Sequence, residues 1–202
     1  AWKESDVTTA QREFRLASGQ EERAQEGDTP FMALVRQCQL VINVSGDMWG
    51  DNAEHVGKSR FLVDLLKMRT VQLLGAKTVL FAGTPGPFTD ETTREFAKEV
   101  YQNFDLVINR EPTSTQNMKE WGFSSRCVKD FACPAFLYTP ELTEEDQAKV
   151  DELIQKLKTG KKLVGFTIGG FNMPVGPYDM WPREEWQYEV FAQVIEHIIN
   201  DL

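Results

Sequence analysis

The chain has 202 residues, a length that allows one domain or one and a half at about 150 residues per domain. Hydrophobic residues make up 41% and charged residues 26%, which is enough apolar content to bury a core and excludes a disordered chain. The 31 acidic and 22 basic residues give a net charge of -9. Such a surface repels phosphate backbones, so nucleic acid is not an expected partner.

The three cysteines, Cys38, Cys127 and Cys133, are separated in the chain and form no CxxC pair. This pattern argues against a disulfide framework and against a zinc knuckle. No apolar run reaches the roughly 18 residues of a membrane span. We therefore expect a cytoplasmic protein with reduced thiols, without a membrane span, a metal site or a bound cofactor.

Residues 1–30 are polar and form a separate N-terminal segment in this interpretation. From residue 31 onward, apolar strands alternate with amphipathic helices. The strands are predicted at 40–44, 78–82, 106–109 and, shorter, 126–128, and the helices at 31–37, 59–74, 90–103 and 112–121. We expect Thr89 to cap the third of these helices and Ser114 to cap the fourth.

Strand–helix–strand units of this length predict right-handed crossovers and a parallel sheet. The predicted fold is therefore α/β, with a doubly wound, Rossmann-like parallel sheet over residues 31–140. A connecting helix is expected over 141–160. An apolar strand at 163–168 and a helix at 184–200 then begin a second α/β unit over 161–202, which stops short of a full domain.

Loops rich in polar residues and glycine follow the first three strands, at the edge of a parallel sheet where ligands usually bind. Gly46, Asp47 and Asp51 follow the first strand, Gly86 lies after the second, and Arg110 follows the third. A guanidinium there can hold a carboxylate or phosphate through two parallel bonds, and a carboxylate can hold a hydroxyl or a proton. A plainer interpretation stays open for each loop: aspartates that cap a helix, a rigid turn, and an exposed ion pair.

Histidine gives little support to catalysis, because His55 and His197 are the only two and lie far apart in the sequence. His197 falls in an amphipathic helix, where packing or solvation explains it. His55 lies close to the first loop and is the stronger of two weak catalytic candidates.

Taken in chain order, these motifs resemble the polysaccharide pyruvyl transferase family. The matching pieces are Ser45-Gly46-Asp47-Met48-Trp49, Gly86-Pro87-Phe88, Asn109-Arg110-Glu111 with Ser114, Asp130 leading to Pro134-Ala135-Phe136, and Val164-Gly165-Phe166-Thr167-Ile168. The resemblance covers residues 31 to 200, approximately.

The resemblance implies two Rossmann-like halves arranged as in GT-B glycosyltransferases, one of which this chain would hold. It implies transfer of the pyruvyl group of phosphoenolpyruvate onto sugar hydroxyls as a ketal, with phosphoenolpyruvate and a glycan acceptor as partners. Arg110 would hold the phosphoenolpyruvate anion, and Asp47 and Glu111 would complete the catalytic group. The substrate-binding residues would be Gly46, Trp49, Asp51, Gly86 and Ser114.

Several features depart from the family pattern, and two of them bear on the chemistry. Ser45 stands where the family commonly has glycine, and neither histidine matches the position of the family's catalytic histidine. Ketal formation protonates an enol carbon and needs a general acid, so we expect a central portion of an enzyme that is not a competent catalyst alone. Two alternatives stay open: a GT-B glycosyltransferase that uses a nucleotide sugar, and a non-catalytic α/β binding module. The acceptor sugar, the linkage and the oligomeric state are left open by the sequence.

Overall fold

The computed structural model describes residues 4–21, 27–158, 160, 164–165 and 185–201. The chain divides into two compact units, Ala1–Tyr138 and Thr139–Leu202. The first unit carries the sheet and its helices. The second contains α6 (Glu144–Leu157) and α7 (Glu185–Asp201), and the strand predicted at 163–168 falls outside the described residues except for 164–165.

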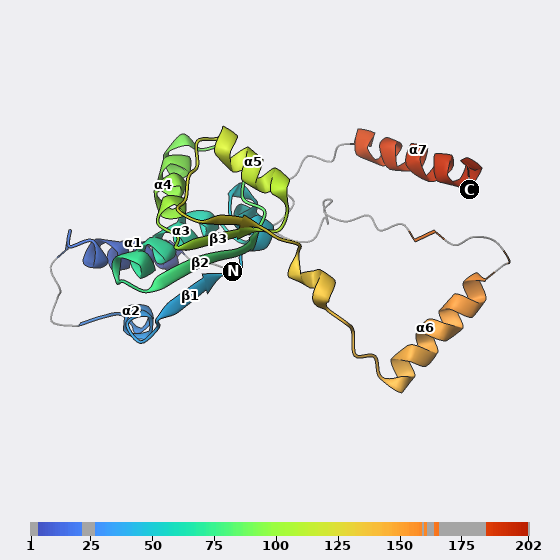
Figure 1. Ribbon diagram of the computed structural model, residues 1–202, viewed down its shortest axis with the longest axis horizontal. Coiled ribbons are helices and arrows are strands. Elements are labelled where there is room, and N and C mark those ends of the chain that lie inside the picture. Colours follow the sequence, from blue (N-terminus) through green and yellow to red (C-terminus); the bar gives the residue numbers. More distant parts are fainter. Residues whose placement is uncertain (1–3, 22–26, 159, 161–163, 166–184, 202) are drawn as a thin grey trace. The chain divides into compact units, whose positions relative to one another are not determined.

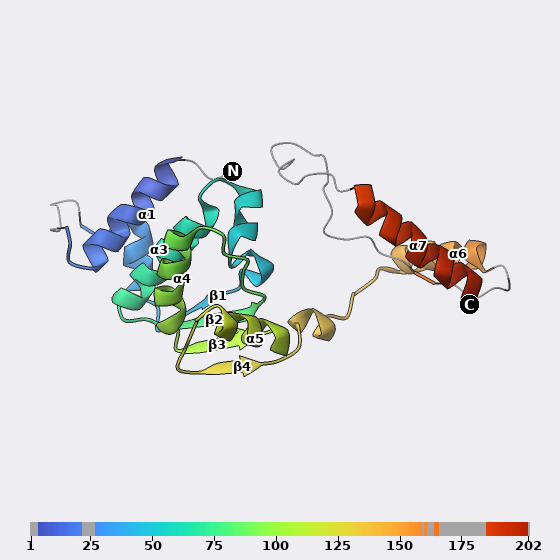
Figure 2. The same ribbon diagram turned by 90° about the horizontal axis from the view of Figure 1, so that it is seen from above.

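Four parallel strands form the sheet of the first unit (Figures 1 and 2). In spatial order they are β1 (Leu40–Asn43), β2 (Lys77–Gly83), β3 (Leu106–Asn109) and β4 (Val128–Asp130). Each strand pairs with the next one in the sequence, as right-handed crossovers moving in one direction require. The predicted α/β fold with a Rossmann-like parallel sheet is confirmed.

The helices of the first unit lie close to their predicted positions. They are α2 (Pro30–Val35), α3 (Arg60–Leu73), α4 (Glu91–Gln102) and α5 (Pro112–Glu120), preceded in the polar N-terminal segment by α1 (Glu4–Ala17). The short 3-10 helices are η1 (Gly46–Met48), η2 (Asp51–Val56) and η3 (Pro134–Leu137). Among the described residues, no helix has the length and apolar character needed to cross a membrane.

Both predicted helix caps were wrong. The cap of α4 is Asp90, whose carboxylate accepts a hydrogen bond from the Thr93 backbone N–H at 2.7 Å, and this bond lowers the pKa of Asp90. Thr89 instead donates to the carboxylate of Asp51. At α5 the capping position belongs to Glu111, while the hydroxyl of Ser114 donates to the Glu111 carboxylate.

The hydrophobic core lies between one face of the sheet and the helices α3, α4 and α5. Leu80 and Val107 point from the sheet into this layer and are fully buried. Trp49 joins them with no exposed surface, and its ring centroid lies 5.6 Å from that of Phe61 and 5.8 Å from that of Phe88. Large aromatic side chains of this kind supply much of the apolar area that a small domain buries.

A buried carboxylate attaches α1 to α3. Glu13 is 1% exposed and forms an ion pair with Lys67 of α3. The Glu13 carboxylate also accepts a hydrogen bond of 2.6 Å from the hydroxyl of Thr29. The polar N-terminal helix therefore belongs to the same compact unit as the sheet.

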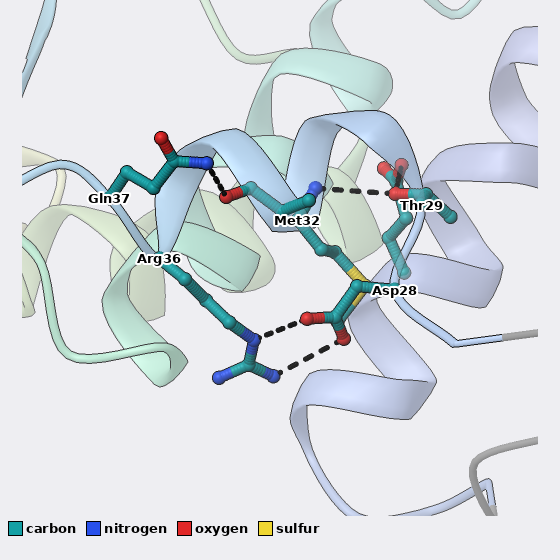
Figure 3. Close-up of polar contacts among 7 residues, drawn as sticks. Asp28, Thr29, Met32, Arg36 and Gln37 are labelled. Carbon is teal, nitrogen blue, oxygen red and sulfur yellow. Dashed lines mark hydrogen bonds and ion pairs between the residues drawn. The ribbon is translucent and has the colours of Figure 1, made fainter.

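The same Thr29 begins α2 (Figure 3). Its hydroxyl oxygen accepts a hydrogen bond from the Met32 backbone N–H at 3.3 Å, which satisfies one of the free N–H groups at the start of the helix. At the other end of the helix, Arg36 reaches back to the carboxylate of Asp28 at 2.5 Å. These contacts hold both ends of α2, the helix that precedes β1.

We expect Glu13→Ala to lower the free energy of unfolding by about 1–3 kcal/mol, because Lys67 and Thr29 lose the acceptor that they share. Glu21→Ala is a matched control that removes an exposed carboxylate 3.0 Å from Arg15, and we expect it to cost less than about 1 kcal/mol. Urea unfolding of both variants measures the difference. Equal losses would contradict a special role for Glu13.

Candidate functional site

Three loops leave the carboxyl ends of neighbouring strands and meet at one edge of the sheet. Loop 1 runs over 45–52 after β1, loop 2 over 83–89 after β2, and loop 3 begins at Arg110 after β3. All the predicted site residues except Ser114, which lies in α5, belong to these loops or, as Glu111 does, follow Arg110 directly. Parallel sheets bind ligands at this edge.

Backbone hydrogen bonds join loop 1 to loop 2 along their length. The three bonds run from Thr84 N to Gly46 O at 3.0 Å, from Gly86 N to Trp49 O at 2.9 Å, and from Asp51 N to Pro87 O at 2.9 Å. The two loops therefore behave as a continuation of the paired strands that precede them.

Glycine makes this close approach possible. A Cβ atom at Gly50 would lie 2.7 Å from the backbone of Gly86, a distance that real Cβ contacts do not reach. Gly86 has a φ of +95°, and a Cβ there would meet the ring of Trp121 at 2.7 Å. Both positions need glycine because of packing, whatever ligand the loops hold.

Loop 3 joins the other two through Arg110. The Nε of Arg110 donates to the hydroxyl of Thr84 and lies 3.6 Å from a carboxylate oxygen of Glu111. The guanidinium side chain is 31% exposed, so solvent and ligands can reach it. The exposed ion pair that the plainer interpretation of this loop expected is therefore present, but it occupies only one edge of the guanidinium.

The loops that carry Asp47 and Arg110 meet at Thr84. The backbone N–H of Thr84 binds the carbonyl of Gly46, the residue before Asp47, and its hydroxyl binds Arg110. Asp47 is exposed, and its backbone carbonyl accepts a hydrogen bond of 3.1 Å from the Asn52 side chain. Sequence analysis did not single out Thr84, because a threonine in a turn next to proline is an ordinary feature.

Four of the predicted substrate-binding residues make structural contacts within or beside the loops. Trp49 is buried in the core. The Asp51 carboxylate accepts bonds of 2.6 Å and 2.7 Å from the backbone N–H and the hydroxyl of Thr89. Gly86 lies so close to Trp121 that a Cβ on it would meet the ring. Ser114 is buried, and its hydroxyl donates to the carboxylate of Glu111. Substrate contact by these residues stays a prediction, whereas their structural contacts are present.

Two asparagines at strand ends form hydrogen bonds where the loops begin. Asn43, the last residue of β1, accepts hydrogen bonds from the backbone N–H of Ser45 at 2.9 Å and from its hydroxyl. Its amide group donates to the Asp64 carboxylate in α3 at 2.9 Å and 3.2 Å. Burial raises the pKa of Asp64, against the lowering effects of the Asn43 hydrogen bond and the Arg60 charge. Loop 1 is thereby attached to α3.

The second asparagine, Asn109, ends β3 and is fully buried. Its amide donates to the hydroxyl of Thr115 in α5 at 2.7 Å, and that hydroxyl donates to Asp130 at the end of β4. Beside it, burial raises the pKa of Tyr101 to about 12, so this phenol keeps its proton at neutral pH. Within the residues that the structure describes, no group of three or more His, Cys, Asp or Glu side chains is placed to hold a metal ion.

We expect Gly50→Ala to separate loops 1 and 2, because the added Cβ would overlap the Gly86 backbone. The strain should lower the free energy of unfolding by about 1–3 kcal/mol in a urea titration. Gly165→Ala is the control, since a Cβ at Gly165 has no heavy atom within 4 Å. Equal stabilities for the two variants would refute the close packing of the loops.

The raised pKa of Asp64 predicts a pH dependence of stability. An unfolded aspartate has a pKa of about 4, so above that pH the folded state holds a proton that the unfolded state has released. The free energy of unfolding then falls as pH rises toward the folded pKa. Asp64→Asn does not titrate, so it removes this pH-dependent loss of stability. Its side-chain oxygen can still accept the hydrogen bond from the Asn43 amide. The stability of the variant minus that of the wild type should therefore increase as the pH rises above about 4 toward the folded pKa.

Asp105→Asn gives the opposite sign and serves as the control. The Asp105 pKa is lowered, first by its hydrogen bond with Lys77 and next by that with the Thr78 backbone, so the ionised group stabilises the fold above the unfolded pKa. Removing it should make the variant lose stability relative to the wild type as pH rises. Urea unfolding at several pH values measures both trends, and a flat difference for Asp64→Asn would show that its burial does not matter.

Comparison with known proteins agrees with the motifs. The model of one family, polysaccharide pyruvyl transferase, matches residues 4–201. Comparison with curated proteins finds no match, and comparison with solved structures finds none either. Because the family match spans nearly the whole sequence, this chain belongs to the polysaccharide pyruvyl transferase family.

Proposed function

We propose that the edge formed by loops 1 to 3 binds phosphoenolpyruvate and takes part in transferring its pyruvyl group to sugar hydroxyls as a ketal. Membership in a transferase family supports an enzymatic role in polysaccharide biosynthesis. The observation that carries the donor assignment is Arg110, a partly exposed guanidinium at the carboxyl edge of the sheet. The protein as a whole has a net charge of -9, so a cation held here is a local feature.

The way Arg110 is held supports anion binding. Among the described residues, its side-chain hydrogen bond, to Thr84, uses Nε, and the Glu111 carboxylate approaches closest to Nε as well, at 3.6 Å. The two Nη groups are left for a ligand, and together they can form two parallel hydrogen bonds with a carboxylate or a phosphate. Phosphoenolpyruvate carries both groups, and either fits this geometry.

The carboxylates divide into two roles. Glu111 already binds Ser114 and lies 3.6 Å from Arg110, which suits it to orient the guanidinium. Asp47 is exposed, and the Asn52 side chain binds its backbone carbonyl rather than its carboxylate, so the carboxylate can face the reacting centre. When the enol carbon of phosphoenolpyruvate is protonated, positive charge develops on the neighbouring carbon, where the sugar hydroxyl adds. A second sugar hydroxyl then displaces the phosphate from the same carbon to complete the ketal. A carboxylate stabilises the positive charge, and a guanidinium stabilises the phosphate that leaves or the carboxylate that stays on the pyruvyl group.

Calorimetric titration with phosphoenolpyruvate tests the proposal. We expect wild-type protein to bind and Arg110→Ala to bind at least about tenfold more weakly, because a charge-assisted pair of hydrogen bonds is lost. Arg110→Lys keeps the charge but not the paired geometry and should fall between them. Arg15→Ala, which removes an exposed arginine of α1, is the matched control.

Two results would contradict the proposal. Equal affinity of wild type and Arg110→Ala would remove Arg110 from the donor site. Protection of the wild type against unfolding by a nucleotide sugar, with none from phosphoenolpyruvate, would favour the glycosyltransferase alternative.

A further inference from the structure

We infer that Thr84 is a second ligand-binding residue of this edge, which both orients the Arg110 guanidinium and donates its own hydroxyl proton to the anion that Arg110 holds. The inference rests on the proposed anion site and extends it to a residue that sequence motifs do not indicate. It also assigns specificity, because a hydroxyl beside a guanidinium favours a ligand with several oxygens grouped on one atom.

The position of Thr84 is fixed by its backbone. The chain turns immediately before it, since Ala82 has a φ of 54° in the left-handed region and the register between β2 and β3 shifts between Phe81 and Gly83. A left-handed alanine is strained, and such strain is retained where surrounding contacts enforce it. Here the Thr84 backbone N–H is bound to the carbonyl of Gly46, which holds the residue between loops 1 and 3.

The donors and acceptors of Thr84 and Arg110 determine which way the Thr84 hydroxyl proton points. A threonine hydroxyl has one proton to donate and two lone pairs that accept. Because the Arg110 Nε has only a proton to give, the Thr84 oxygen is the acceptor in their contact. Among the described residues, the Thr84 hydroxyl accepts from Arg110 and donates no hydrogen bond of its own. The proton is therefore available to a ligand oxygen next to the guanidinium.

Two substitutions separate this role from general stability. Thr84→Val keeps the shape of the side chain and removes the hydroxyl, whereas Thr84→Ser keeps the hydroxyl. In the full chain, we expect Thr84→Val to raise the dissociation constant for phosphoenolpyruvate by about 10- to 100-fold and Thr84→Ser to stay within about threefold of wild type. The melting temperature of each variant is measured beside the affinity, and Thr84→Ala replaces Thr84→Val if the latter does not fold.

A spectroscopic readout tests the orientation of Arg110 without any ligand. The Nε–H signal of Arg110 in a proton–nitrogen correlation spectrum is assigned by its loss in Arg110→Lys. We expect this signal to be retained in Thr84→Ser and to shift or broaden in Thr84→Val. Titration with inorganic phosphate and with pyruvate then shows whether the hydroxyl serves the phosphate or the carboxylate.

The outcomes distinguish the two proposals. If wild type binds phosphoenolpyruvate and Thr84→Val binds it equally well, the inference about Thr84 is overturned and the donor site stands. If wild type does not bind phosphoenolpyruvate, the proposed function fails, and Thr84 is judged on phosphate binding and on the Nε signal alone. Weaker phosphate binding and a changed Nε signal in Thr84→Val, with both retained in Thr84→Ser, support the inference. Any other pattern overturns it.

Discussion

The contact between the backbones of Gly50 and Gly86 is the constraint on which the site depends. A side chain at Gly50 would force the loops apart, and the three hydrogen bonds between loops 1 and 2 could not all form. Trp49, next to Gly50, is fully buried among the aromatic side chains of the core. Removing it from water contributes about 2–3 kcal/mol, so the loop is held by the core as well as by its neighbour. A site built on loops anchored in this way keeps its geometry better than one on free loops.

The charges at this edge are arranged so that one cation stays accessible in an acidic protein. Asp51 is occupied by two hydrogen bonds from Thr89, and Glu111 by Ser114. The ion pair between Arg110 and Glu111 spans 3.6 Å, and both side chains are about one-third exposed. Pairs of this kind contribute little because water screens them. An anionic ligand that takes both Nη groups can therefore add to this pair without displacing it.

The sequence was sufficient for the elements of the sheet but not for the roles of the residues in its loops. Apolar runs predicted the strands and helices because burial of one face is a local pattern. The cap of α4 was missed because Thr89 and Asp90 both suit that role, and the choice depends on Asp51, 38 residues away in the sequence. Trp49 is predicted to bind substrate because it belongs to the Ser45–Trp49 motif that resembles the family, and its sequence context shows no sign that it also packs in the core. Its burial depends on aromatic side chains from α3, α4 and loop 2, which no local pattern reveals.

One signal in the sequence was available and was not used. The strands β1 and β3 have the same four residues, Leu-Val-Ile-Asn, and each ends in a buried asparagine. Strand alternation turns each asparagine toward the helices, where its amide must find an acceptor. Asn43 finds Asp64 in α3, and Asn109 finds Thr115 in α5.

This arrangement explains why a carboxylate is kept at Asp64 although its burial raises the pKa and opposes ionisation. An apolar side chain there would leave the Asn43 amide unpaired, at a cost of about 1–3 kcal/mol. The Asn43 carbonyl that holds Ser45 would then lose its fixed orientation. A polar pair that adds little to net stability can thus be retained because it determines where the first loop begins, and with it the position of Asp47.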